Sequence, residues 1–115
     1  MTWLLALAIA FAPPARAAGV AFGSAAYPVT GIASFYAAPT GTAAAGPKLR
    51  RALGPHWRGA VIRVCVNGHC TRVRLTGWCQ CYAGTRRERL VDISRGSFAR
   101  LAPPSRGLVV VRVTW

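Results

Sequence analysis

A tight turn at Asn67-Gly68, with a cysteine on each side of it, sets the register of the middle of this chain. An Asn-Gly pair is the strongest short hairpin signal, because both residues accept the positive φ angles of a two-residue turn. Such a turn places Cys65 directly opposite Cys70. Directly opposed residues bring their Cβ atoms within bridging distance. The turn therefore predicts an antiparallel hairpin closed by a Cys65–Cys70 disulfide.

All four cysteines lie between positions 65 and 81, and the other two are Cys79 and Cys81. An even count in a small exported domain favours disulfides. The Cys65–Cys70 bridge would leave Cys79 and Cys81 to close a ring across one residue, so the crossed pairings stay open as the alternative. A zinc site, with His69 as a further ligand, is the other interpretation. Export and the hairpin geometry favour disulfides, and we expect no metal and no cofactor.

The first 17 residues resemble a secretory signal peptide, because an apolar run over 3–11 is followed by the small-residue pattern Ala15-Arg16-Ala17. No Lys or Arg precedes the apolar run. The run is far shorter than the roughly 20 residues that cross a bilayer, so we expect no transmembrane segment. The Ala-, Gly- and Ser-rich residues 18–30 predict a flexible lead-in. Residues 31–115 then form one small domain, which we expect to be a secreted, extracellular or periplasmic monomer.

The chain is strongly basic, with 15 Lys and Arg against 2 acids. Without Arg16 the count is 14 against 2, a net charge of +12. This charge predicts a salt-sensitive attraction to anionic polymers, among them teichoic acid, anionic lipid, nucleic acid and the carboxylates of peptidoglycan. No aromatic-basic nucleic-acid motif is present, so we expect no specific nucleic-acid partner. A cationic antimicrobial or polyanion-binding module is one candidate function.

Short segments in which apolar and polar residues alternate dominate the domain. Residues 37–48 are small and turn-prone and predict a loop without core content, and 77–89 predict an irregular loop. One helical turn is expected at 49–53 and a short helix at 94–101. The predicted hairpin has one apolar face and one arginine-lined face. Several short strands with little helix predict a mostly β, small closed barrel, with strands at 31–36, 60–66, 69–76, 90–93 and 108–115.

Asp92 is the only aspartate in the chain and lies in the short apolar strand before Ser94. One interpretation is structural: the carboxylate caps the following helix or pairs with an arginine. The other is a functional site, in which this residue carries any carboxylate chemistry. We expect the clustered arginines to favour its ionised form.

Five sequence blocks in order resemble the double-psi β-barrel of the rare lipoprotein A and expansin group. The blocks are 31–36 (GIASFY), 59–64 (GAVIRV), 72–76 (RVRLT), 91–94 (VDIS) followed by 98–101 (FARL), and 107–113 (GLVVVRV). The resemblance implies a six-stranded barrel with one or two short helices and a shallow polysaccharide groove. It also implies action on bacterial peptidoglycan, either as a lytic transglycosylase or by loosening wall glycans without cleavage.

The resemblance carries over to single residues. Asp92 matches the aspartate of the family's Asp-Leu-Ser motif, and Ser34 and Tyr36 match the hydroxyl and aromatic positions that line the groove. Two departures count against catalysis. Gly77 stands where family members with a second acid carry it, and Arg50 stands near the position of the transglycosylase histidine.

Aromatic residues in the predicted loops supply candidate sugar contacts. Trp57, Trp78 and Tyr82 could stack on sugar rings while arginines meet carboxylates or phosphates. Alternatively, each ring closes an end of the barrel as part of the core. Trp78, between Gly77 and Cys79, is the strongest candidate for ligand contact.

The sequence thus favours a secreted barrel that binds cell-wall glycan, peptidoglycan in particular, with weak or no lytic activity. Its expected ligand-binding residues are Ser34, Tyr36, Trp78, Tyr82 and Asp92. The enzymatic alternative is a peptidoglycan lytic transglycosylase with Asp92 as its catalytic general acid. The arginine-rich surface leaves the cationic polyanion-binding module as a third interpretation.

Overall fold

The computed structural model describes residues 28–115. The predicted signal peptide at 1–17 and the lead-in up to residue 27 lie outside the described residues. The described part contains six strands and three short helical elements. They are β1 (Val29–Tyr36), β2 (Thr42–Ala45), α3 (Pro47–Leu53), β3 (Val61–Val66), β4 (His69–Trp78), β5 (Arg89–Ser94), α4 (Arg95–Phe98), the 3-10 helix η1 (Pro104–Arg106) and β6 (Val109–Thr114).

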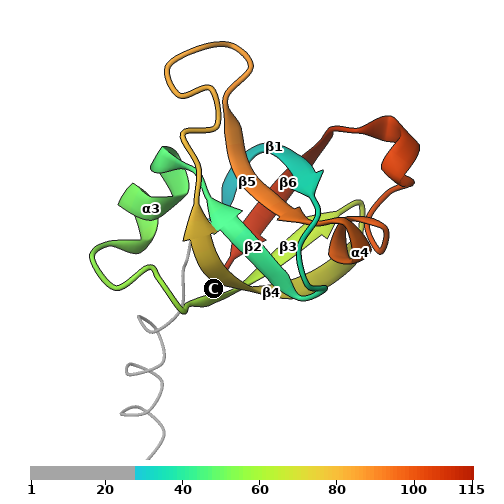
Figure 1. The fold of residues 1–115 in the computed structure, drawn as a ribbon, viewed down its shortest axis with the longest axis horizontal. Coiled ribbons are helices and arrows are strands. Elements are labelled where there is room, and N and C mark those ends of the chain that lie inside the picture. Colours follow the sequence, from blue (N-terminus) through green and yellow to red (C-terminus); the bar gives the residue numbers. More distant parts are fainter. Residues whose placement is uncertain (1–27) are drawn as a thin grey trace, which may run out of the picture.

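The strands close into a barrel in the order β1-β5-β2-β4-β3-β6 (Figure 1). The pairs β1–β5 and β2–β4 are parallel, and the other neighbours are antiparallel. Strands distant in sequence therefore lie side by side, and β5 is inserted between β1 and β2. Going around the barrel, β3 is three strands from β5 in either direction, so these two strands form opposite walls. This architecture confirms the predicted small, mostly β, six-stranded barrel with short helices.

The β3–β4 hairpin has the register that the Asn67-Gly68 turn predicts. Both turn residues have positive φ, 47° at Asn67 and 87° at Gly68. Cys65 pairs with Cys70 in the ladder, and a disulfide joins them across a Cα–Cα distance of 4.1 Å.

Cys79 and Cys81 form the second disulfide, across a single intervening residue. The crossed pairings and the zinc interpretation are therefore both wrong for this structure, because both cysteine pairs are oxidised and supply no thiolate ligands. Within residues 28–115, no group of three or more His, Cys, Asp or Glu side chains is placed to hold a metal ion.

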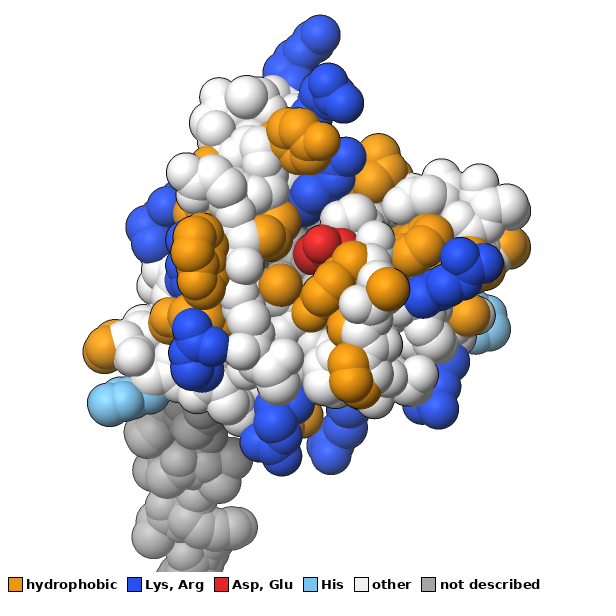
Figure 2. All heavy atoms as spheres, viewed as in Figure 1, with side chains coloured by type: hydrophobic (Ala, Val, Ile, Leu, Met, Phe, Trp, Pro, Cys, Tyr) orange, Lys and Arg blue, Asp and Glu red, His pale blue; other side chains and the backbone are white. Residues whose placement is uncertain are grey.

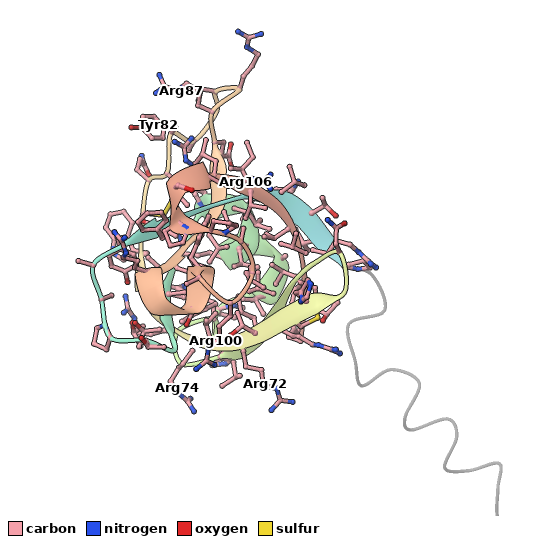
Figure 3. The ribbon with its side chains drawn as sticks, turned by 90° about the vertical axis from the view of Figure 1, so that its right-hand side faces the viewer. Arg72, Arg74, Tyr82, Arg87, Arg100 and Arg106 are labelled. Carbon is pink, nitrogen blue, oxygen red and sulfur yellow. A yellow bond between two sulfur atoms is a disulfide. The ribbon has the colours of Figure 1, made fainter. Side chains whose placement is uncertain are left out.

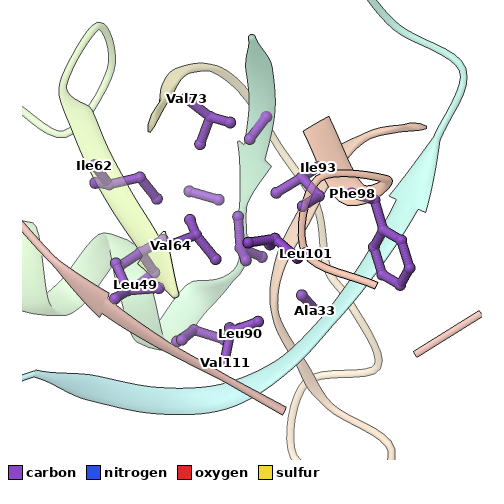
Figure 4. Close-up of a cluster of buried hydrophobic side chains, with 14 of the residues drawn as sticks. Ala33, Leu49, Ile62, Val64, Val73, Leu90, Ile93, Phe98, Leu101 and Val111 are labelled. Atoms are coloured by element: carbon purple, nitrogen blue, oxygen red, sulfur yellow. The ribbon is translucent and has the colours of Figure 1, made fainter. Parts of the chain in front are cut away.

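The core fills the inside of the barrel with aliphatic side chains (Figure 4). Buried and exposed side chains alternate along the hairpin as predicted, and its inward side chains are almost fully buried: Ile62, Val64, Val73 and Leu75. Phe98 of α4 closes one end and packs at 4.9 Å between ring centroids against Phe35 of β1. Complete burial of side chains of this size contributes roughly 1.5–3 kcal/mol each relative to exposure.

Strand β2 corrects the expectation of a coreless loop over 37–48. Ala43, Ala44 and Ala45 are buried, and β2 is hydrogen-bonded to β4 on one side and β5 on the other. Alanine has a weak strand propensity, and a run of alanines has no alternating pattern. The neighbouring strands impose the extended conformation here, and the small side chains let β4 and β5 approach from both sides.

Several boundaries also differ from the expected ones. β1 begins at Val29, inside the predicted lead-in, and β4 extends to Trp78, which therefore ends a strand and does not lie in a loop. The expected helix over 94–101 is helical only at 95–98 and continues as turn. The expected turn at 49–53 is longer, because Pro47 starts α3 and Gly54, with φ of 87°, ends it. Of the helices in residues 28–115, none has the length and apolar character needed to span a bilayer.

Two glycine-to-alanine substitutions test the close packing of the chain before α3 against β5. A Cβ at Gly46 would lie 2.5 Å from the Arg89 carbonyl oxygen and 2.9 Å from that of Leu90, so backbone would have to move. We expect Gly46→Ala to lower the free energy of unfolding by about 2 kcal/mol or more, measured by urea denaturation. Gly77→Ala is the control, because its Cβ would meet only the Ala44 Cβ, at 3.8 Å. It should change stability by no more than about 0.5 kcal/mol; equal effects would contradict the described α3–β5 junction.

Candidate functional site

Asp92 lies on the outer wall of the barrel, in the middle of β5. It pairs with Ser34 of β1 on one side and Ala44 of β2 on the other. The Ser34 hydroxyl donates a hydrogen bond to Asp92 Oδ1 at 3.0 Å. Strand alternation turns Val91 and Ile93 inward and Asp92 outward, where it remains half-buried. Its bond to the β1 hydroxyl replaces the helix-capping role that its position before Ser94 suggests.

Ser94, the serine of the same motif, holds a loop in place. The Gly41 amide donates to Ser94 Oγ at 3.2 Å and to Ser97 Oγ at 2.9 Å, and the two hydroxyls are 3.0 Å apart. This network fixes the β1–β2 connection against α4. The wall beside Asp92 is therefore held at the C-terminal end of β5.

Burial raises the pKa of Asp92 above its ordinary value. The hydrogen bond from Ser34 and the charge of Arg89 act in the opposite direction, and burial outweighs both. The charge of Arg89 acts in the direction expected of the arginines, toward the ionised form, but the net direction of the pKa is upward. The arginines act weakly because most of them extend into solvent, where their charges are screened.

Tyr36 completes the polar group around Asp92. Burial is the main cause of its raised pKa, the negative charge of Asp92 adds to it, and a hydrogen bond with Thr42 acts against it. The structure therefore brings together Ser34, Tyr36 and Asp92, three of the predicted site residues. Thr42 joins them from β2, the strand that the sequence does not predict.

Small residues form the surface next to Asp92. The register places Asp92, Ala44 and Gly77 in one row across β5, β2 and β4. Figure 2 shows an acidic group on this face, set in a hollow between hydrophobic side chains with basic side chains at its margin. Gly77 adds no side chain to this row.

Arg50 and two tryptophans form a cluster at the β4 side of this face. The guanidinium carbon of Arg50 lies 5.3 Å from the Trp78 ring centroid and 5.9 Å from that of Trp57. Arg50 Nη1 donates to the carbonyl oxygens of Ala45 at 2.7 Å and Cys79 at 3.1 Å, which holds the side chain in place. Trp57 packs against the core, whereas Trp78 is 57% exposed. Of the two, Trp78 is the ring free to meet a ligand.

Tyr82 lies on the loop between β4 and β5, which projects from the barrel (Figures 1 and 3). Its ring is 52% exposed and is flanked by Arg89 at 4.7 Å and Arg87 at 5.1 Å. Arg89 also acts electrostatically on Asp92, so it links this loop to the acidic group. Tyr82 and Trp78 flank the Ser34–Tyr36–Asp92 group without belonging to it.

Glu88, the only other acid, is not placed as a catalytic partner. Its Oε1 accepts a hydrogen bond from the Gly84 amide at 2.9 Å and braces the projecting loop. It precedes Asp92 by four positions along extended chain, roughly 13 Å. Paired carboxyls of glycosidases are about 5–9.5 Å apart. The described site is therefore a single-acid site.

Sequence reasoning missed Thr42 and Arg89 as members of this surface, and it noted Arg50 only through the family resemblance, as standing near the position of the transglycosylase histidine. Thr42 could not be identified because β2 lacks an alternating pattern of apolar and polar residues, although a threonine before three small residues is compatible with a strand. In a sequence with this many arginines, no local pattern indicates which of them pack against aromatic rings and which extend into solvent. Their positions depend on contacts between distant segments.

The raised pKa of Asp92 predicts a pH-dependent difference in stability. The folded protein binds this proton more tightly than the unfolded chain, whose aspartate has a pKa of about 3.9. Asp92 therefore stabilises the fold below about pH 4, and this contribution is lost as the pH rises through the folded pKa. Asp92→Asn cannot titrate, so its free energy of unfolding relative to wild type should increase between about pH 3 and about pH 7 in urea denaturation.

Ser34→Ala is the second arm of this measurement. It removes the hydrogen bond that lowers the pKa of Asp92, so the stability of this variant should fall more steeply with pH than that of wild type. A difference between wild type and Asp92→Asn that stays constant over this range would contradict the raised pKa.

Comparison with known proteins identifies the fold. No protein-family model matches the chain, and no curated protein sequence matches it. Among solved structures, Streptomyces papain inhibitor is 23% identical with a TM-score of 0.54, over 77% of this chain and 93% of the inhibitor.

Clavibacter michiganensis expansin is also similar. A mutant of it in complex with cellohexaose is 15% identical and the apo protein 18%, each with a TM-score of 0.58 over 76% of this chain. The match spans half of each expansin chain. At these identities the likeness concerns the fold, and this chain has the expansin-like double-psi β-barrel fold that its sequence blocks resemble.

Proposed function

We propose that this protein binds a cell-wall glycan, peptidoglycan in particular, along the outer face of β1, β5 and β2. The observation that carries the proposal is the half-buried Ser34–Tyr36–Asp92 group, which faces outward over a floor of small side chains. Buried polar groups usually satisfy one another in a core. Here the group instead opens onto a surface hollow that can receive a ligand.

Each part of this face has a role in binding a sugar chain. The free lone pairs of Asp92 accept hydrogen bonds from sugar hydroxyls, and Tyr36 donates one. Ala44 and Gly77 leave the wall flat enough for a chain to cross. Trp78 offers an exposed ring for stacking on a sugar, which is a favourable contact for an aromatic with one wet side.

The charges near the face favour an acidic glycan. Arg50 and Arg89 border it and can pair with carboxylates of muramic acid or of the peptide stems. The expansin in complex with cellohexaose supports the use of this barrel for a polysaccharide. The two disulfides agree with an exported protein, which would meet the wall outside the cytoplasm.

Lytic activity is proposed to be weak or absent. The raised pKa of Asp92 favours the protonated form that a general acid needs, and this observation supports the transglycosylase alternative. Against it, the site has one acid, with Gly77 where a partner would lie. Substrate cleavage would then depend on attack by the muramyl hydroxyl without a second carboxyl to stabilise the transition state.

A binding experiment on purified peptidoglycan sacculi tests the proposal. Trp78→Ala should weaken binding by about fivefold or more with a nearly unchanged melting temperature, because an exposed stacking ring is lost. Asp92→Asn should also weaken binding, because a charged acceptor becomes neutral. Trp115→Ala is the matched control, an exposed tryptophan next to β6 on the far wall, and it should bind like wild type.

The soluble fraction of the same experiment separates binding from catalysis. Wild-type protein should release no muropeptides detectable by mass spectrometry. Release that disappears in Asp92→Asn while binding persists would establish the transglycosylase alternative. Unaltered binding in both Trp78→Ala and Asp92→Asn would refute this face as the glycan site.

A second candidate function is inhibition of a papain-like protease. The match to Streptomyces papain inhibitor covers 93% of that protein, and in this chain the loop between β4 and β5 projects from the barrel. The Cys79–Cys81 disulfide constrains the first arm of this loop, and a hydrogen bond from the Arg89 amide to the Cys81 carbonyl oxygen at 2.8 Å joins its two arms. A projecting, pre-ordered loop binds a cleft at low entropic cost.

A papain assay tests this second candidate. If the loop inhibits, Tyr82→Ala should raise the inhibition constant by about tenfold, because Tyr82 is the large exposed aromatic side chain of this loop. Trp78→Ala, outside the loop, should leave inhibition unchanged. Absence of inhibition by the wild-type protein at high concentration would eliminate the candidate for papain.

A further inference from the structure

The wall opposite Asp92 carries a set of arginines on its outer face. We call it the arginine face and define it by the outward residues of β3, β4 and β6. Its cations are Arg63, Arg72, Arg74 and Arg112, all exposed. In Figure 3, Arg72 and Arg74 point away from the barrel on the side opposite Tyr82 and Arg87.

The register places like charges against each other. Arg63 pairs directly with Arg72 in the β3–β4 ladder. Directly opposed like charges destabilise a sheet. The only two acids of the chain, Glu88 and Asp92, lie on the loop before β5 and on β5 itself, so neither compensates this pair. This arrangement weakens the isolated barrel and creates a strong positive potential on one wall.

Exposed apolar side chains lie among these arginines. Val61 is 41% exposed, Val110 63% and Trp115 39%. Val61, Arg63, Arg72, Thr114 and Trp115 line one shallow hollow of about 340 Å³. A purely ionic partner would leave these apolar groups in water. A neutral sugar chain would leave the arginines unpaired.

We propose that the arginine face binds the surface of an anionic phospholipid membrane. Guanidinium groups match lipid phosphates in geometry and charge, and Arg63 and Arg72 together can hold one phosphate in the hollow. Tryptophan prefers the boundary between headgroups and acyl chains, where Trp115 would insert with Val61 beside it. A lipid surface uses both the charges and the apolar groups of this face.

This membrane face is separate from the proposed glycan site. Strand β3 lies across the barrel from β5, so a lipid surface on one wall leaves the Ser34–Tyr36–Asp92 group open. One copy of the protein could therefore contact a membrane and a wall polymer together. The membrane proposal does not depend on the glycan proposal.

Vesicle flotation tests it, using the chain from residue 18 onwards so that the apolar residues 3–11 do not contribute. The protein should float with vesicles of phosphatidylcholine mixed with phosphatidylglycerol and not with phosphatidylcholine alone. Each arginine near an anionic bilayer is worth roughly a fivefold change in partition. Arg63→Gln/Arg72→Gln should thus reduce binding by roughly 25-fold, with an equal or higher melting temperature because the like-charge pair is removed.

Two controls separate the membrane face from total charge and from a soluble polyanion site. Arg86→Gln/Arg87→Gln removes the same charge from the projecting loop and should leave vesicle binding nearly unchanged; an equal loss there would overturn the proposal. Trp115→Ala should weaken vesicle binding severalfold and leave binding of soluble inorganic polyphosphate unchanged. The opposite result would be that Trp115→Ala binds vesicles like wild type, while Arg63→Gln/Arg72→Gln loses binding to polyphosphate as strongly as binding to vesicles. In that case the face binds soluble polyanions, and the lipid proposal is refuted.

Discussion

The parallel pairing of β1 with β5 is the contact on which the site depends. It joins Ser34 to Asp92 across 58 positions of sequence, and β5 can lie there only because β2 flanks it on its other side. Parallel neighbours need long connections, which here run through the hairpin and the projecting loop. Closing these connections costs chain entropy before any contact is gained. The compact core and the Gly41–Ser94–Ser97 network supply the compensating interactions that hold the pairing.

Asp92 illustrates how position outweighs total charge. The chain has 15 basic residues, yet burial beside Ser34 and Tyr36 governs the direction of the Asp92 pKa. Screening in water limits a surface arginine to a short range, whereas partial loss of hydration acts on the half-buried carboxylate itself. The direction of the Asp92 pKa is therefore set by the immediate surroundings of the carboxylate and not by the net charge of the chain.

The parts of the fold that local rules determine could be predicted from the sequence. The Asn67-Gly68 turn predicted the hairpin, its register and the Cys65–Cys70 bridge, because a two-residue turn leaves no other pairing. The alternation of β3 and β4 predicted which residues enter the core. Strand β2 could not be predicted, since Ala43 to Ala45 are extended only because β4 and β5 lie on either side. For the same reason Thr42 escaped notice, whereas the family resemblance placed Ser34, Tyr36 and Asp92 on one barrel.

The register of the hairpin also explains how the barrel tolerates its arginine face. The Arg63–Arg72 pair lies two residues along the same ladder from the disulfide-bonded pair Cys65–Cys70. A like-charge cross-strand pair costs up to about 1 kcal/mol. A disulfide typically contributes about 2–4 kcal/mol, with short loops toward the lower end. The bridge therefore more than offsets the repulsion beside it, so the barrel tolerates a like-charge pair in the middle of its hairpin.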